Sequence, residues 1–151
     1  MPYPYDWFGW ALSTGDFDGN GGRDLAIAAK EDVEAGGHGT TTVLFGTSEG
    51  LTAIGDQLIS QNSPGIKGTG WSRPTSLRGG DFDGDGFWDL AIGNCTDDDV
   101  QGFPVGSTQI IYGSSSGLSD RDLLWLASDF FTIGDAENSG FGDVGSRGLC
   151  L

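Results

Sequence analysis

The chain is poor in cysteine, histidine and basic residues, and these shortages exclude several classes of protein. Its 151 residues include two cysteines, one histidine and 7 lysines and arginines, against 22 aspartates and glutamates. Two cysteines are too few for a disulfide scaffold, and whether Cys95 and Cys150 pair within the chain, between chains or not at all stays open. The net charge of −15 repels nucleic acid and anionic membrane surfaces, so neither is an expected partner.

Long apolar runs and helical periodicity are also missing. No run approaches the roughly 20 apolar residues of a membrane-spanning helix, so we expect no membrane insertion. Residues 1–6 lack the basic start and the apolar stretch of a signal peptide. No Gly-x-Ser-x-Gly elbow, Cys–His pair or phosphate-binding loop appears, which favours a protein that is not an enzyme.

Glycine, in contrast, is abundant, with 28 residues in 151, where about 7% is average. Such a composition predicts many tight turns between short strands. Short apolar segments bounded by Gly, Ser and Asp are strand signals, and each half of the chain has four. The predicted strands span 11–15, 24–29, 41–45 and 57–60, and then 75–80, 89–94, 107–112 and 123–126.

Two acidic loops are the most informative segments. Residues 16–24 read Asp-Phe-Asp-Gly-Asn-Gly-Gly-Arg-Asp, and residues 81–89 read Asp-Phe-Asp-Gly-Asp-Gly-Phe-Trp-Asp. Both place oxygen side chains at loop positions 1, 3, 5 and 9 and lead directly into an apolar strand. Clustered carboxylates repel each other unless a cation lies among them, and a site with many oxygens favours Ca²⁺ before Mg²⁺. An EF-hand is excluded because position 12 is apolar, Ile27 and Ile92.

The loops belong to a longer repeat. Asp16 and Asp81 lie 65 residues apart, and residues 43–51 correspond to residues 110–118 at a distance of 67. Four-stranded units in tandem predict an all-β fold of β-propeller blades. The predicted divisions are a first blade at 8–67, a second blade at 68–133, and at 134–151 the start of a third repeat or a blade-completing segment, because residues 141–143 read Phe-Gly-Asp.

This pattern resembles the FG-GAP repeat of integrin α-subunit propellers and their bacterial relatives. The resemblance rests on Phe8-Gly9, on the two loops and on the Asp-Leu-Ala-Ile that ends each of them, although the second unit has Gly70-Trp71 in place of Phe-Gly. It implies one Ca²⁺ per loop, two per chain, held by side chains at positions 1, 3, 5 and 9 and by the carbonyl of position 7. The implied ligands are Asp16, Asp18, Asn20, Gly22 and Asp24, and then Asp81, Asp83, Asp85, Phe87 and Asp89. With Asn20 in place of a carboxylate, the first site is expected to be the weaker one.

Two blades and part of a third cannot close a ring, because closed propellers have about 4–8 blades. The sequence therefore predicts completion by oligomerisation, with three chains giving six blades, while a fragment of a longer protein stays the alternative. Calcium is millimolar outside cells, which favours an extracellular or secreted setting.

A non-catalytic module that binds a protein or a glycan is the function that these features favour. A lectin that stacks sugars on Trp7 or Trp88 is one alternative, with Trp10 and Trp71 assigned to the core. An enzyme on the same scaffold, or the non-catalytic part of a polysaccharide-acting enzyme, is another. The fold alone does not choose among them.

Overall fold

The protein is built from β-strands joined by turns. The computed structural model describes residues 7–32, 38–60, 62–66, 73–94 and 106–119, and the course of the strand at 122–126. No helix occurs in this part of the chain. The strands are β1 (Phe8–Gly15), β2 (Asp24–Asp32), β3 (His38–Thr47), β4 (Gly50–Ser60), β5 (Pro74–Gly80), β6 (Asp89–Asn94), β7 (Ser107–Ile111) and β8 (Asp122–Leu126). The all-β prediction is confirmed.

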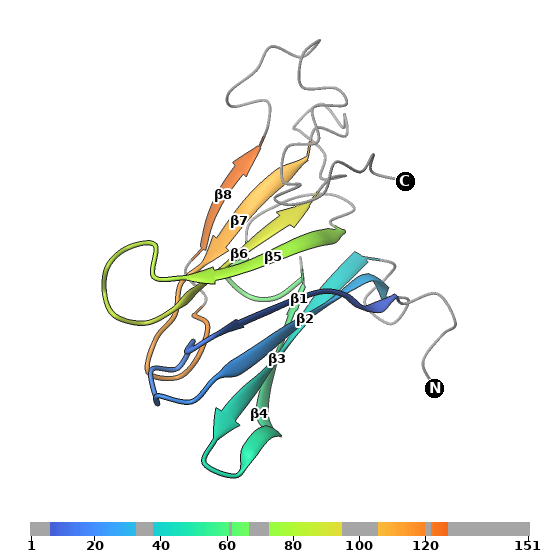
Figure 1. Ribbon diagram of the computed structural model, residues 1–151. Coiled ribbons are helices and arrows are strands. Elements are labelled where there is room, and N and C mark those ends of the chain that lie inside the picture. Colours follow the sequence, from blue (N-terminus) through green and yellow to red (C-terminus); the bar gives the residue numbers. More distant parts are fainter. Residues whose placement is uncertain are drawn as a thin grey trace.

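The strands form two antiparallel sheets of four, in the orders β1-β2-β3-β4 and β5-β6-β7-β8 (Figure 1). Each sheet is a meander in which consecutive strands are neighbours, as expected for two repeats of one unit. Every predicted strand is present. β4 begins at Gly50 rather than at residue 57, because a tight turn at 48–49 returns the chain directly onto β3.

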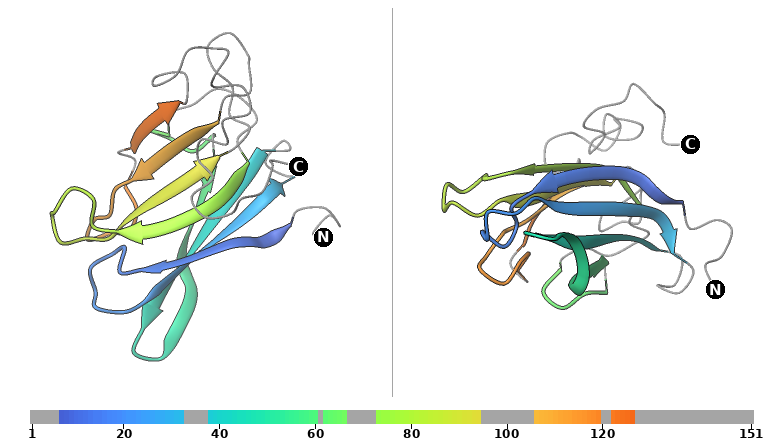
Figure 2. Two further views of the ribbon diagram at one scale, coloured as in Figure 1. Left: turned by 45° about the horizontal axis from the view of Figure 1, so that its top comes forward. Right: turned by 60° about the horizontal axis from the view of Figure 1, so that its bottom comes forward.

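The two sheets pack face to face, with β5 lying against β1 and β2 (Figure 2). Apolar side chains from both sheets meet between them and leave water together, which stabilises the pair. The buried cluster consists of Phe17, Ala26, Ala28, Val43, Leu77, Leu90, Ile92, Ile111 and Leu118. The apolar central strands β2 and β6 are buried along most of their length, in keeping with the continuous apolar runs that the sequence shows there.

Glycine permits the close approach of β5 to β1. A Cβ atom on Gly79 would lie 2.7 Å from the carbonyl oxygen of Thr14, well inside van der Waals contact. The Gly79 amide also donates a hydrogen bond to Ser13 Oγ at 2.9 Å. A second connection is made by Gln57, whose side chain donates to the Leu118 carbonyl and accepts from the Leu118 amide, both at 2.9 Å. The two sheets are thus joined by polar bonds as well as by the core.

Two predictions about tryptophan are wrong. Trp10, expected in the core, is 46% exposed. It lies where the pairing of β1 with β2 is interrupted, and its ring faces the Lys30 ammonium, 4.5 Å from the ring centre, rather than the core cluster. Trp88, expected to be exposed, is partly buried against the core. The expectation that Trp7 is exposed is confirmed.

Several predictions fall outside the described residues. These are the unit starts at 70–71 and 141–143, both cysteines and the segment 134–151. The divisions at 8–67 and 68–133 stay predictions. Within the part of the chain that is described, no helix is long and apolar enough to cross a membrane.

Candidate metal centres

Both acidic loops join the first two strands of their sheet, and both lie at the same end of the molecule, on the left in Figure 1. Each loop turns sharply at two glycines with positive φ. Gly19 and Gly21 have φ of 68° and 84°, and Gly84 and Gly86 have φ of 80° and 95°. Such angles are unfavourable for residues with a Cβ, so the glycines at loop positions 4 and 6 fold the acidic residues back on one another.

Three carboxylates converge in each loop. Oxygens of Asp16, Asp18 and Asp24 lie within 4.8 Å of one another, and the same holds for Asp81, Asp83 and Asp89. The residues at position 9, Asp24 and Asp89, are fully buried. The structure thus brings together loop positions 1, 3 and 9 in both repeats, from residues that the sequence had singled out.

The buried carboxylate at position 9 connects its loop to the third strand of its sheet. Asp24 accepts hydrogen bonds from the Phe17 amide at 2.6 Å and the Gly46 amide at 2.8 Å. Asp89 accepts the equivalent bonds from Phe82 and Gly113, at 2.7 and 2.9 Å. Hydrogen bonds from backbone amides to a charged acceptor are stronger than neutral ones, so each carboxylate fixes the start of its loop relative to the end of the third strand.

Burial raises the pKa of Asp24 above its usual value. The negative charges of Asp18 and Asp16 raise this pKa further, while the hydrogen bonds from Gly46 and Phe17 lower it. The buried surroundings of Asp24 therefore disfavour its charged form. A cation bound among the three carboxylates would instead favour the charged form.

The surroundings of Asp16, at loop position 1, show whether the first site fits a metal. Asp16 Oδ2 accepts a hydrogen bond from the Gly21 amide at 3.0 Å. Its other oxygen, Oδ1, is buried and has no hydrogen-bond partner among the described residues. A buried carboxylate oxygen without a donor is destabilising unless a cation binds it. This oxygen and its two neighbouring carboxylates form a donor set that suits a hard cation such as Ca²⁺.

The side chains at loop position 5 make hydrogen bonds to nearby groups of the protein in both loops. The Asn20 amide group donates to Asp18 Oδ2 at 2.9 Å and to the Gly46 carbonyl at 3.0 Å, while its Oδ1 accepts from the Gly22 amide. Asp85 Oδ1 accepts from the Phe87 amide at 2.9 Å, and Asp85 does not belong to the carboxylate group of its loop. Both side chains thus fold back and accept a hydrogen bond from the backbone amide of loop position 7. Ligation by Asn20 and Asp85, and by the carbonyls of Gly22 and Phe87, stays a prediction.

Two further residues of the site, Gly46 and Gly113, were not recognised from the sequence. A Cβ on Gly46 would collide with the backbone of Arg23, and a Cβ on Gly113 with the backbone of Trp88. Only glycine lets the end of the third strand come close enough to donate to the buried carboxylate. The available signal was that the two glycines occupy equivalent positions of the repeat, 67 residues apart.

The two loops also contact each other across the sheets. The Ser114 amide donates to the Phe17 carbonyl at 3.3 Å, and the Arg23 guanidinium lies 5.8 Å from the centre of the Trp88 ring. A residue of each loop is therefore held by the other repeat.

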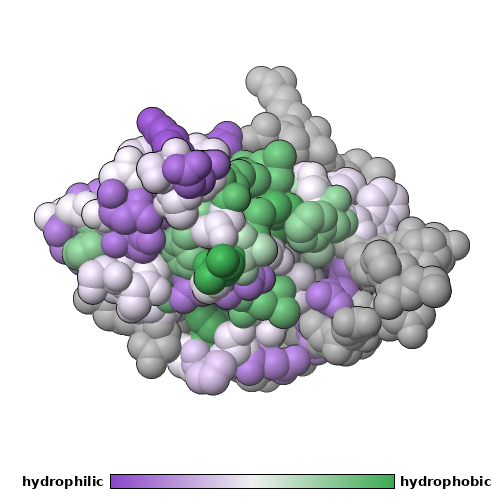
Figure 3. Space-filling model, turned by 90° about the horizontal axis from the view of Figure 1, so that it is seen from below, coloured by the Kyte–Doolittle hydropathy of each residue, from purple (hydrophilic) through white to green (hydrophobic). Residues whose placement is uncertain are grey.

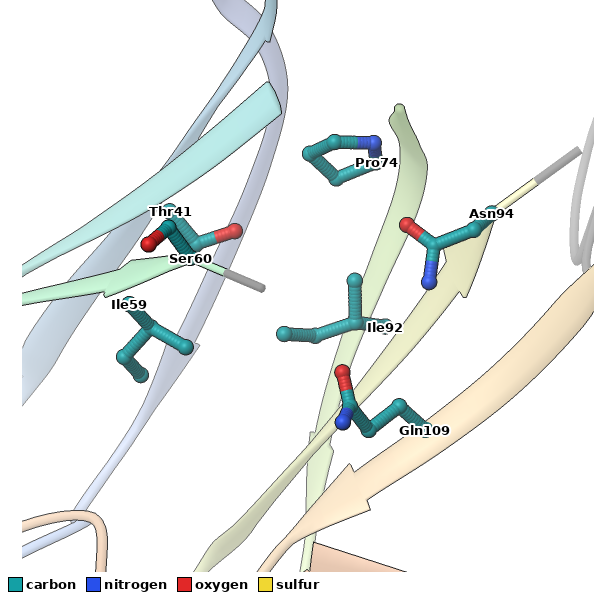
Figure 4. A pocket seen from close by; sticks show the side chains of 7 residues that line it. All are labelled: Thr41, Ile59, Ser60, Pro74, Ile92, Asn94 and Gln109. Carbon is teal, nitrogen blue, oxygen red and sulfur yellow. The ribbon is translucent and has the colours of Figure 1, made fainter. Parts of the chain in front are cut away.

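A small cavity lies between the sheets, away from the loops (Figure 4). Its volume is about 20 Å³, which is room for about one water molecule. It is lined by Thr41, Ile59, Ser60, Pro74, Ile92, Asn94 and Gln109. Asn94 Oδ1 is buried without a partner among the described residues, so a water that bridges polar side chains suits this space better than a substrate does.

Two stacked four-stranded sheets with equivalent acidic loops define a repeat protein with candidate cation sites. Residues 8–44 match the model of the FG-GAP repeat, so the chain contains an FG-GAP repeat. The resemblance to this repeat that the sequence showed is therefore confirmed. The chain is also similar to human integrin alpha-7, at 34% identity over 95 residues. This match covers 62% of the chain but 8% of the integrin's length. Together they indicate an interaction module of the β-propeller type.

Proposed function

We propose that this chain is a calcium-stabilised FG-GAP module that acts by binding a protein or a glycan outside the cell, without catalysis. The observation that carries the proposal is the pair of carboxylate triads at equivalent places in the two repeats. Acidic residues in one exposed loop are common, whereas two loops that bury the same carboxylate and bond it to equivalent amides indicate a shared purpose.

In the first loop, Asp16, Asp18 and Asp24 would hold the ion, and in the second loop Asp81, Asp83 and Asp89 would do so. The ion supplies the positive charge that three neighbouring carboxylates need. The chain itself supplies the rigidity, because Asp24 and Asp89 are already fixed by two backbone amides each. The role assigned to calcium is therefore structural: it keeps the turn between the first two strands closed.

The assignment as a non-catalytic, extracellular binding module draws support from two sides. The acidic residues of the two loops have the spacing of metal ligands. A metal-binding role therefore explains their presence, and no catalytic acid–base pair is needed to explain it. The similarity to an integrin α-subunit agrees with a binding role, and millimolar extracellular calcium would keep loops of modest affinity filled.

Isothermal titration calorimetry of the whole chain with Ca²⁺, and separately with Mg²⁺, tests the metal proposal. We expect two calcium sites and weaker binding of magnesium. Asp24→Asn should remove or strongly weaken one site, and Asp89→Asn the other. A chain that is folded but takes up no calcium would contradict the proposal.

A lectin is the second candidate, and the exposure of Trp7 favours it. Trp7 is 54% exposed and makes an edge-to-face contact with Trp10, with ring centres 5.6 Å apart. Trp88 is less suitable, since it is partly buried and lies beneath Arg23. Glycan binding on an array that is lost on Trp7→Ala, with calcium uptake unchanged, would favour the lectin. Binding that is insensitive to Trp7→Ala would count against it.

A further inference from the structure

The first acidic loop contains an Asn-Gly pair, Asn20-Gly21, whose chemistry is separate from metal binding. In such a pair the backbone nitrogen of the glycine can attack the side-chain carbonyl carbon of the asparagine, because glycine has no Cβ to hinder the approach. A Cβ built on Gly21 would meet no atom of the described chain within 4 Å, so the space beside this residue is open. The steric conditions for the attack are therefore favourable.

The fold places a hydrogen-bond partner on each group that takes part in this attack. The Gly21 N–H, which carries the attacking nitrogen, donates to Asp16 Oδ2 at 3.0 Å. The carbonyl oxygen of the attacked group, Asn20 Oδ1, accepts from the Gly22 amide. The nitrogen that would leave, Asn20 Nδ2, donates to Asp18 Oδ2 at 2.9 Å. A carboxylate beside the nucleophile and an N–H beside the carbonyl oxygen are what general-base catalysis and oxyanion stabilisation require.

We propose that Asn20 is a site of spontaneous deamidation and that the loop itself assists the reaction. The Gly21 nitrogen bonds to Asn20 Cγ as its proton passes to Asp16 Oδ2, and the Gly22 amide stabilises the negative charge that develops on Oδ1. The Cγ–Nδ2 bond then breaks, and the nitrogen takes up that proton and leaves as ammonia. The cyclic imide that remains is opened by water to aspartate or isoaspartate. Nothing is oxidised or reduced, so water is the one further reactant.

The water that opens the imide reaches the loop directly from solvent. Asn20 and Gly21 are both exposed. Seen from below, hydrophilic residues gather on the left of the molecule (Figure 3), which is the end at which both loops lie in Figure 1. The loop is therefore accessible for the second step as well as for the first.

The second loop already has the product of this reaction. Asp85 stands at position 5, where the first loop has Asn20, and Gly86 follows it. The hydrogen bonds are repeated, because the Gly86 amide donates to Asp81 Oδ2 at 3.1 Å and the Phe87 amide donates to Asp85 Oδ1 at 2.9 Å. Deamidation to aspartate therefore gives the first loop the same side chains as the second at positions 1, 3, 5 and 9.

The reaction changes the charge of the first candidate metal centre. Conversion to aspartate adds one negative charge, and a loop with more carboxylates binds Ca²⁺ more tightly. A bound ion would in turn engage the oxygens of Asp16 and Asp18 that assist the reaction, so calcium should slow it. This consequence rests on the proposed calcium function, whereas the deamidation itself does not.

Peptide mapping by mass spectrometry of the whole chain, incubated folded in chelator at neutral pH, tests the proposal. Asn62 is the internal reference, since it is also exposed but is followed by Ser63. We expect Asn20 to lose its amide first, and Asp16→Asn to slow this loss about tenfold or more relative to Asn62 of the same chain. The control Asn20→Gln, one carbon longer, should release no ammonia from this position. An Asn20 that stays intact in the folded chain, after the urea-unfolded chain has lost its amide, would overturn the proposal.

Asp85→Asn provides a gain-of-function test, because it installs the same pair among the equivalent hydrogen-bond partners of the second loop. Position 85 should then deamidate as position 20 does, whereas the wild type has no amide there to lose. A variant that keeps its amide at position 85 while losing it at position 20 would overturn the assistance by the loop.

Calcium distinguishes this inference from the proposed function. We expect slower deamidation in calcium than in chelator, and tighter calcium uptake by the chain that has been converted to aspartate. A chain that takes up calcium but keeps its Asn20 amide in chelator overturns this inference alone. A chain that loses the amide in chelator but takes up no calcium overturns the calcium proposal alone.

Discussion

The backbone amide of Trp88 donates a hydrogen bond of 3.1 Å to the carbonyl oxygen of Asp16. The eighth residue of the second loop is thereby fixed to the first residue of the first loop. The ring of Phe87 lies against Gly19 at the same junction. The two loops that carry the candidate cation sites are therefore in direct contact, which provides a physical route for coupling between them.

Calcium binding at the two sites should be coupled. Asp89→Asn, which weakens the second site, is expected to lower the calcium affinity of the first site as well, by about fivefold. Where each variant only empties its own site, linkage makes the effect of Asp24→Asn on the second site similar in size, because the coupling free energy between the two bound ions is shared. Calorimetric titration of the wild type and both variants measures the two factors. Affinities that stay unchanged at the distant site in both variants would show that the sites are independent.

Alanine at the fourth loop position provides a matched comparison. Gly19 and Gly84 both have positive φ, so Ala at either position lowers stability by about 1–2 kcal/mol. A Cβ on Gly19 would also lie 2.5 Å from the Phe87 ring, whereas a Cβ on Gly84 meets no atom within 4 Å. We expect Gly19→Ala to be the more destabilising in urea unfolding and to disturb both sites. Equal losses for the two variants would mean that the packing of Phe87 on Gly19 adds nothing.

The fifth loop position should determine which site is stronger. Asn20→Asp adds a carboxylate to the first loop but removes the amide hydrogens that Asn20 donates to Asp18 and Gly46. We expect the variant to be less stable without calcium and to bind calcium more tightly. Asp85→Asn is the converse change and should weaken the second site. Thermal unfolding with and without chelator, together with calorimetry, checks both. An Asn20→Asp variant with unchanged affinity would exclude position 5 as a ligand.

Removal of calcium should lower the melting temperature. A ligand at about 100 times its dissociation constant stabilises the folded state by about 2.7 kcal/mol per site. For two sites in a chain of this size, that amounts to a shift of about 10 °C or more. Differential scanning calorimetry in saturating calcium and in chelator measures it. The double variant Asp24→Asn with Asp89→Asn is the control and should melt at the same temperature in both conditions.

The strands and the loops were predictable because their signals are local. Apolar segments between glycines and acids located all eight strands, and the nine-residue spacing predicted that Asp16, Asp18 and Asp24 come together. The first part of β4, before residue 57, was missed because Gly50 and Gly55 interrupt its apolar pattern. Trp10 was misplaced because its exposure depends on which neighbour covers β1, and that is a property of the tertiary arrangement rather than of the local sequence.

Tertiary contacts also decide the roles of the residues at loop position 5 and of the glycines near the end of the third strand, and the local sequence does not predict such contacts. Nothing in the spacing indicates that Asn20 and Asp85 fold back onto the amide two residues ahead. Likewise, the role of Gly46 depends on the approach of its strand to Arg23, a contact between segments that are more than twenty residues apart. Spacing within a loop is readable from the sequence, whereas the partners that a loop acquires from other strands are not.

The bond between Asp24 and Gly46 has a consequence for the order of folding. A hairpin of β1 and β2 can close the loop without β3, but the buried carboxylate then lacks the amide that holds one of its oxygens. If the loops bind calcium as proposed, high-affinity capture is expected to follow the docking of β3, and the same order applies to Asp89, Gly113 and β7. In a stopped-flow refolding experiment, calcium would then slow unfolding while leaving the earliest folding phase unaltered.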